Sequence, residues 1–492
     1  MREATREDED GGRSAMTGIG RAAGTGPVCP AGRPEPDGTG EPGGPDGSGE
    51  PVRNPDAGFV AGMAPGRLPL LGHGHVLLRR PLPFLASLPS HGDLVEVRVG
   101  PKPFHVICHP ELAHRVLTSD RVFDKGGPMF NKLRDLVGDG LASCPHARHR
   151  RQRRMVQPAF RADRLPGYAE VMTAQTLAVT AGWRHGETVD LHGQLLTVSA
   201  RTLAHTIFTA EHCADAVAAA VPFAQMITSG LTAELLTPAV LKSVPTPTRR
   251  RFARRTAELR TAVLEAIGRY RREGVDRGDL LSILLAERDG ERLTDEEVFV
   301  ELVGMAIAGV ETVASTLNWA FRLLHRHPDI ERRLHAEVDR VHGGRAPTWD
   351  DLPRLELTSR VFQEALRLFP SDWLLTRVTT EDTELAGRAL PAGTLVAFNG
   401  YAVHQRADLY PRPTVFDPDR WADPRLPRGG FLSFGGGGRK CIGDAFGTVE
   451  GTLALAAIAG AWRLAPARPS RVRPAPLRPR QALGYPMRVS AR

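Results

Sequence analysis

The most distinctive stretch of this sequence, FGGGGRKCIG, contains one cysteine, Cys441, shortly after four consecutive glycines. A single cysteine is usually a small buried hydrophobic residue, but glycines let a backbone approach a flat ligand closely or take left-handed angles. A largely apolar, helix-compatible stretch follows from Asp444, which places Cys441 near a helix N-terminus that favours a thiolate. Such a thiolate is a nucleophile or a metal ligand. Because the local pattern offers no catalytic His or Asn, we favour the ligand.

Two polar residues, Glu311 and Thr312, follow Ala308 and Gly309 in the middle of a long apolar run. One interpretation is structural: the glycine kinks a helix, and the Thr312 hydroxyl bonds back to the carbonyl of Ala308. The other is functional, because an acid in a buried helix is costly unless it has a role or a partner. The pattern alone leaves both open.

Charged residues at helical spacing form two further clusters. Glu364 and Arg367 lie on one helix face, a spacing that usually gives a surface ion pair of little energetic value. His149 and Arg153 stand four residues apart within HRRQRR. Read alone, this basic run would indicate a nucleic-acid patch or a solvated face, and strongly salt-dependent DNA binding would be its signature.

A long helix must carry the Glu311 motif. Thr294 and Glu297 form a capping box at its start, and Pro328 ends it after His327. At about 1.5 Å per residue, this helix is on the order of 50 Å long. Its apolar middle, 302–320, nearly matches a bilayer's thickness, but the polar interruptions and the capping box favour a buried central helix over a transmembrane one.

The remaining elements are mostly helical, with a small β region. Alternation over 93–99 and an apolar run over 104–108 predict an antiparallel hairpin, with Val95, Val97 and Val99 on one face. A second strand region is predicted around 383–398. The fold class is therefore mainly α with a small β region, in one large domain over 58–492.

Composition supports a soluble protein with a tail. Of 492 residues, 41 % are hydrophobic and 24 % are charged, which is ordinary for a globular chain. Residues 1–57 hold thirteen glycines, eight prolines, six arginines and eleven acids with no apolar run, so we predict a disordered tail that is neither a signal peptide nor a membrane anchor. The five cysteines lack CxxC spacing, which argues against disulfides or structural zinc and favours a reducing cytoplasm.

Together, these motifs resemble the cytochrome P-450 monooxygenases. The haem-binding pattern of that family, FxxGxRxCxG, is matched at every fixed position. The resemblance covers roughly 65–489 and implies the family fold, a haem b cofactor and O₂ as a substrate. Cys441 would be the axial thiolate of the haem iron, and Arg439 would contact a haem propionate. The residues that the resemblance assigns to haem binding are Phe434, Gly435, Arg439, Cys441, Gly443, His149, Arg153 and Arg377.

Other roles also follow from the resemblance. Glu364, Arg367 and Arg420 would form a buried structural triad behind the haem, with Trp421 standing where the family often has Phe. The helix would open at Gly309 to make an O₂ pocket, where Thr312 hydrogen-bonds the oxygen and Glu311 helps to relay protons.

The resemblance also implies electron-transfer partners. Because no flavin domain is found in the chain, electrons are expected from a ferredoxin and its NAD(P)H-dependent reductase. The formal net charge of +8 favours an acidic protein partner over nucleic acid. Four residues are expected to form its docking surface: Arg150, Arg151, Arg154 and Lys440. We expect a cytoplasmic monomer.

The substrate is expected to be apolar. The regions around 373–377 and 420–443 resemble bacterial terpene oxygenases of the pentalenene oxygenase type, which implies oxidation of a sesquiterpene methyl group to the alcohol and aldehyde in antibiotic biosynthesis. Expected contact zones include the loop 126–143 and the stretch 221–244. Alternatives are a fatty-acid or polyketide hydroxylase, and a haem-thiolate sensor, binding or dehydratase-like protein without oxygenation. The expected pocket residues are Ala308, Trp373, Leu374 and Leu375.

Overall fold

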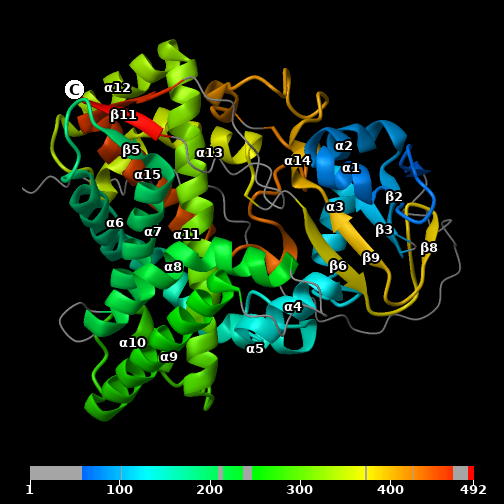
Figure 1. Cartoon of the computed structure of the whole chain (residues 1–492), viewed down its shortest axis with the longest axis horizontal. Coiled ribbons are helices and arrows are strands. Elements are labelled where there is room, and N and C mark those ends of the chain that lie inside the picture. The colour runs from blue at the N-terminus through cyan, green and yellow to red at the C-terminus, as the bar shows by residue number, and fades with distance from the viewer. Residues whose placement is uncertain are drawn as a thin grey trace, which may run out of the picture. The chain divides into compact units, whose positions relative to one another are not determined.

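Helix α11, Asp295–Arg326, forms the centre of the fold in this computed structural model (Figure 1). The side chain of Thr294 caps it and Glu297 reaches back, so the predicted capping box is formed. Its neighbours are helices from both halves of the chain. Among the described helices, α11 alone is long and apolar enough to cross a membrane, but 56 % of its most apolar window is buried inside the protein. It therefore forms the hydrophobic core, as predicted.

The structure describes residues 58–100, 102–208, 214–236, 246–371, 374–423, 425–468 and 486–492. The predicted disordered tail, residues 1–57, lies outside them. Within this part the chain is mostly helical. The helices besides α11 are α1 Gly74–Arg79, α2 Pro81–Ser87, α3 Pro110–Thr118, α4 Gly127–Val137, α5 His146–Val156, α6 Leu165–Thr180, α7 Leu191–Ile207, α8 Ala214–Leu236, α9 Pro247–Glu273, α10 Leu280–Leu285, α12 Pro328–His342, α13 Glu356–Leu368, α14 Gly400–His404 and α15 Asp444–Ala461.

A six-stranded sheet of order β1-β2-β3-β9-β6-β4 lies on the right of Figure 1, beside α1, α2 and α3. Its strands are β1 Ala61–Met63, β2 Leu94–Val99, β3 Lys102–Ile107, β4 Phe123–Asp124, β6 Leu375–Thr379 and β9 Leu395–Phe398. Two small sheets pair β10 Trp462–Pro466 with β11 Pro486–Ala491 and β5 Thr188–Asp190, and β7 Thr383–Leu385 with β8 Arg388–Leu390.

The predicted hairpin is present as the antiparallel pair of β2 and β3, with Val95 opposite Val106. Val95 and Val97 are buried, but Val99 is 50 % exposed because the strand leaves the core at its end. The second predicted strand region is also formed, by β7, β8 and β9. The strands outside these two regions, β1, β4, β5, β6, β10 and β11, were not predicted.

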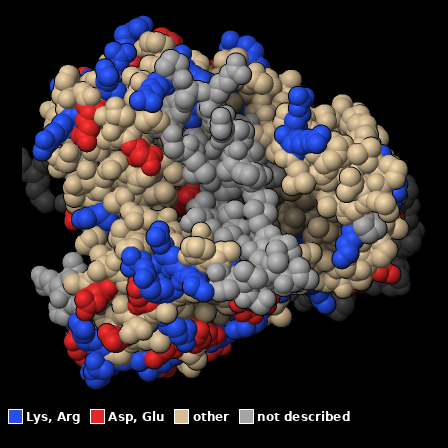
Figure 2. Space-filling view, viewed as in Figure 1, with Lys and Arg blue, Asp and Glu red and all other residues tan. Residues whose placement is uncertain are grey.

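Basic and acidic side chains lie together at the lower left of Figure 2, where the arginine-rich α9 packs against α11. Arg260 forms an ion pair with Glu296, and Arg271 forms one with Asp295. A surface that mixes both signs in this way lacks the single-sign potential that attracts a polyanion. The nucleic-acid alternative rests on the HRRQRR run of α5, where Arg151 and Arg154 also form ion pairs, with Glu297 and Glu291.

A buried carboxylate joins α13 to the chain that precedes Cys441. Glu364 accepts from Arg367 at 2.9 and 2.8 Å and from the Nε of Arg420 at 3.1 Å. Arg367 also donates to the carbonyls of His404 and Pro413. The three charged residues thus meet as the resemblance implies. Glu364 and Arg367 are fully buried, so the surface-pair interpretation of Glu364 and Arg367 is wrong.

Trp421 completes this network with a bond that a phenylalanine would lack. Its Nε1–H donates to Glu364 Oε2 at 2.9 Å, on the 3-10 turn Pro418–Trp421. A hydrogen bond to a charged group contributes about 1.5–3 kcal/mol. The resemblance to the family marks Trp421 as a departure, because Phe is common at that position, but assigns it no function.

We predict that Trp421→Phe lowers the free energy of unfolding by about 2 kcal/mol, because the buried carboxylate loses one donor. Chemical denaturation of the purified protein measures this change. The control is Trp462→Phe, which removes an indole that packs near Trp183, away from Glu364. Equal losses in the two variants would show that the Trp421 hydrogen bond contributes nothing specific.

Candidate functional site

The loop before Cys441 is folded back on itself and ends at the start of α15. The backbone N–H of Cys441 donates to the carbonyl of Phe434 at 2.8 Å, and that of Lys440 donates to Gly437 at 3.1 Å. α15 begins at Asp444, close to the expected start, so Cys441 precedes a helix N-terminus as predicted. Cys441 is exposed, and its position suits the binding of a group above the loop.

Gly437 allows this loop to lie against α3. Its φ is +61°, and a Cβ there would stand 2.1 Å from the carbonyl oxygen of Leu117. Gly435 also has a positive φ, of +66°. Two of the four glycines therefore have conformations that other residues rarely adopt. The glycine run fixes both the shape of the loop and its close contact with the backbone of α3.

Arg439 lies buried behind the loop and is held by protein groups. Its guanidinium donates to Asp124 Oδ1 at 2.7 Å and to the carbonyl of Cys144 at 2.8 Å. The resemblance assigns Arg439 to a haem propionate. In this structure Arg439 connects the cysteine loop to β4 and to the chain before α5, and its contact with a propionate stays a prediction.

Arg153, on α5, also contacts the loop. It donates to the carbonyl of Lys440 at 2.7 Å and to that of Gly438 at 3.3 Å. The resemblance assigns Arg153 to a propionate as well, but its described hydrogen bonds hold the backbone around Cys441. A cation so close to a cysteine also favours the thiolate form.

Several cationic side chains converge near Arg439 with too little negative charge among them. Burial, and then the charge of Arg439, lowers the pKa of Arg377 to about 10. Burial and the charges of Arg377 and Arg439 lower the pKa of Lys125 to about 7. Burial and neighbouring cations also lower the pKa of His149 to about 3, so this imidazole is neutral at pH 7.

This cluster fits the acidic edge of a haem. Like charges brought together out of water disfavour one another, so an added pair of carboxylates would compensate a charge that the protein leaves unbalanced. Arg377 donates to the carbonyl of Thr376, and the carboxylates of Asp124 and Asp120 only partly offset its burial and the charge of Arg439 beside it. The exposed Cys441, the glycine-shaped loop and this cationic group therefore match the donor set of a thiolate-ligated haem.

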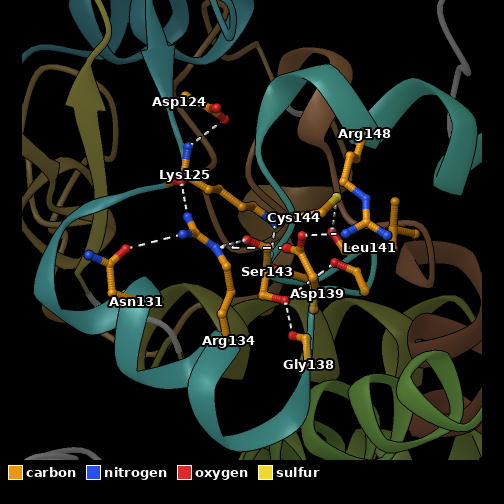
Figure 3. Close-up of polar contacts among 12 residues, drawn as sticks. Asp124, Lys125, Asn131, Arg134, Gly138, Asp139, Leu141, Ser143, Cys144 and Arg148 are labelled. Carbon is orange, nitrogen blue, oxygen red and sulfur yellow. Dashed lines mark hydrogen bonds and ion pairs between the residues drawn. The ribbon is translucent and has the colours of Figure 1, made fainter. Parts of the chain in front are cut away.

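Lys125 also holds the loop that precedes α5 (Figure 3). Its Nζ donates to the carbonyl of Ala142 at 2.7 Å. Arg134, on α4, donates to the carbonyls of Lys125 and Ser143. The N–H of Leu141 donates to Glu301 of α11 at 2.9 Å. Part of the predicted substrate zone 126–143 is thus fastened to α11 and to the cationic cluster.

The Glu311 motif keeps a regular helical backbone. The Thr312 hydroxyl donates to the carbonyl of Ala308 at 2.7 Å, as the structural interpretation expects. The expectation that α11 opens at Gly309 is wrong for this structure, because the helix runs unbroken through it. Since Thr312 satisfies the Ala308 carbonyl without a break, nothing forces the backbone apart. Glu311 is buried, with His192 of α7 at 3.4 Å.

The predicted pocket residues lie in different settings. Ala308 is exposed on α11, whereas Leu374 and Leu375 are half-buried where β6 begins. Trp373 lies outside the described residues, as does part of the predicted zone 221–244. Phe223, in the described part of that zone, is buried in the core between α8 and α9.

The expected partner-docking surface is largely neutralised by local ion pairs. Arg151 pairs with Glu297, Arg154 with Glu291, and Lys440 with Asp444. Exposed Arg150 instead lines an open groove of about 800 Å³. The other residues lining the groove are Asp120, His146, His149, Arg153, Arg154, Gln157, Pro158, Arg161 and Gly438.

Two residues of this site were missed by sequence reasoning. Lys125 is one of only five lysines in a chain rich in arginine, but no motif pointed to it. His192 belongs to no motif either. It is part of the site only through its contact with Glu311, which is 119 positions away in the sequence. Packing between distant segments brings each of them to the site.

Comparisons with known proteins agree with this geometry. The family model described as Cytochrome P450 matches residues 64–485. The chain is 46 % identical to cyclooctatin synthase of Streptomyces melanosporofaciens, covering 84 % of this chain and 92 % of that protein. It is 44 % identical to pentalenene oxygenase of Streptomyces avermitilis, covering 85 % and 94 %. The crystal structure of the cytochrome P450DA heme domain superimposes with a TM-score of 0.77 at 25 % identity, covering 88 % of this chain and 98 % of that one.

We predict that Cys441→Ala abolishes the red-shifted Soret band of the reduced, carbon-monoxide-bound protein, because that band requires thiolate ligation. Absorption spectroscopy of the haem-loaded variant measures it. Cys108→Ala is the control: burial raises the pKa of Cys108 to about 12, so it is a thiol at pH 7, and its variant keeps the band. A band that persists in Cys441→Ala would overturn the assignment.

Proposed function

The chain belongs to the cytochrome P450 family and is a monooxygenase, and we propose that it oxidises a cyclic terpene hydrocarbon in secondary metabolism. The observation that carries the substrate class is the identity of about 45 % with relatives named pentalenene oxygenase and cyclooctat-9-en-7-ol 5-monooxygenase. These alignments cover more than nine-tenths of each relative. A sesquiterpene whose methyl group is oxidised to the alcohol and aldehyde is the specific proposal.

The candidate pocket residues are compatible with a hydrocarbon. Ala308, Leu374 and Leu375 are apolar, and none carries a charge that would anchor a carboxylate. Burying apolar surface contributes about 25 cal/mol per Å², so such a wall binds a hydrocarbon without polar contacts. A missing methylene changes the free energy by only about 1–3 kcal/mol, and related terpenes should therefore also bind.

The cofactor would be haem b, with Cys441 as its axial ligand. When bound, a thiolate-ligated haem supplies oxygen activation, since the thiolate favours O–O cleavage. Arg377, Lys125 and neutral His149 would hold its carboxylates, and Arg439 would act through the Asp124 and Cys144 contacts that fix the loop. Arg153 holds the loop carbonyls next to Cys441.

Glu311 and Thr312, both on α11, would transfer protons. The Thr312 hydroxyl rests on the carbonyl of Ala308, and rotation about its side-chain bond frees this proton for transfer into the space beside Ala308. Glu311 is the nearest acid in sequence and is buried, so it can return a proton to Thr312 without bulk water.

Electrons would come from a ferredoxin and its NAD(P)H-dependent reductase. The groove of about 800 Å³ next to α5 is lined by four arginines against one carboxylate, that of Asp120. Gly438, of the loop that carries Cys441, also lines it. An acidic protein fits this charge. We further propose that the protein acts as a cytoplasmic monomer.

We predict that Thr312→Ala keeps haem and substrate binding but uncouples turnover, because the proton-donating hydroxyl is lost. Reductant would still be consumed, and peroxide would be released in place of product. Parallel assays of reductant, peroxide and product measure this ratio. Thr316→Ala is the control, since Thr316 makes the same backbone bond one turn further along α11. Unchanged coupling in Thr312→Ala would mean that its hydroxyl only bonds to the helix backbone.

We predict that cyclic sesquiterpenes shift the haem spin state and are oxidised when ferredoxin, reductase and reduced nicotinamide are supplied. Diterpenes, fatty acids and macrolide aglycones are tested in the same panel by spectroscopy and mass spectrometry. For an apolar pocket we expect weak binding of several terpenes and no binding of the fatty acids. Turnover of fatty acids or aglycones alone would replace the terpene proposal with that alternative.

A further inference from the structure

His192 lies beside Glu311 in the core, although no motif links the two residues. Its Nε2 stands 3.4 Å from Glu311 Oε1, and both side chains are about 5 % exposed. His192 is the second residue of α7, and α7 packs closely along α11. A buried carboxylate is costly unless donors or positive charge compensate it, so an imidazole at this distance affects how the carboxylate is held.

The hydrogen-bonding pattern of His192 indicates which nitrogen carries its proton. His192 Nδ1 is buried and has no hydrogen-bond partner within the part of the chain described here. A proton on Nδ1 would therefore be an unsatisfied buried donor, which costs free energy. The neutral ring thus places its proton on Nε2, where it points to Glu311. The separation is slightly longer than an ordinary hydrogen bond, and such contacts in active sites often tighten when substrate binds.

The two functional residues of α11 face different neighbours. Successive residues of a helix point about 100° apart, so Glu311 and Thr312 do not share a face. Glu311 is buried beside α7, whereas Thr312 is half-buried next to exposed Ala308. The orientation of the Glu311 carboxylate therefore depends on α7 as well as on α11.

We propose that His192 is the positioning residue of Glu311: its Nε2–H holds the carboxylate in the orientation from which Glu311 exchanges a proton with Thr312. The proton passes between Thr312 Oγ1 and Glu311 Oε2, the carboxylate oxygen that does not face His192, and His192 keeps its own proton throughout. This inference rests on the proposed role of Glu311 in proton delivery. It adds a residue on a second helix to that role.

The first test observes the contact without turnover. In the ferrous carbon-monoxide complex, which is diamagnetic, ¹⁵N-labelled histidine gives NMR signals that His192→Gln assigns by their loss. Glu311→Gln is expected to shift the His192 Nε2 signal and to leave that of His205, a half-buried histidine on the same helix, unchanged. An unshifted His192 signal would overturn the proposal whether or not the terpene substrate is correct.

The second test is a double-mutant cycle on coupling, the ratio of product formed to reductant consumed, with any substrate that shifts the spin state. Glu311→Gln is expected to lower coupling about 100-fold, because it removes a proton-transfer group. His192→Phe is expected to lower coupling less, about tenfold, because His192 only positions that group. The double variant should be no worse than the lower single variant, because the two residues act as one unit.

His192→Gln, which retains an N–H donor, should restore most of the coupling, and His205→Phe should leave it unchanged. Substrate affinity measured by the spin shift should stay the same in all variants. Multiplying losses in the double variant, or normal coupling in His192→Phe, would show that His192 has no such role. If His192→Phe does not fold, two measurements replace it. The first compares the coupling of His192→Gln with that of His192→Asn, and the second is the NMR test.

Discussion

The buried carboxylate of Glu364 is the interaction on which the surroundings of the cysteine loop depend. It receives donors from Arg367, Arg420 and Trp421. Arg367 in turn holds the carbonyl of His404, and the ring of His404 accepts the N–H of Leu432 just before the loop. A buried ion pair that loses one partner leaves an uncompensated charge, which costs about 3–5 kcal/mol. The position of the loop thus follows from an electrostatic requirement in the core.

The cationic cluster imposes a second constraint in the opposite sense. Lys125 and Arg377 have lowered pKa values because they are buried near Arg439. The apoprotein therefore holds charges that repel one another, and a dianionic cofactor would relieve that repulsion. Lys125 also donates to the carbonyl of Ala142, so one side chain belongs both to the cationic cluster and to the support of the loop before α5.

Helix α11 serves both the core and the chemistry. Most of its second half is buried in the main hydrophobic cluster, yet Ala308 is exposed and Thr312 is half-buried. A long helix can combine these tasks because its residues divide among several faces. Its neighbours then decide which polar residue meets which partner, and α7 supplies His192 to Glu311.

The sequence by itself determined the family, the thiolate loop, the long helix and the hairpin. Each of these rests on local features: glycines that permit positive φ, a capping box, a proline stop and period-2 alternation. The tertiary structure decided the rest. In it, Arg439 donates to Asp124 and Arg153 donates to the loop carbonyls. The helix is continuous at Gly309. Lys125 and His192 lie at the site. These contacts join segments far apart in the chain, and because a side chain's partner depends on where the other segment packs, spacing along the sequence carries no record of them.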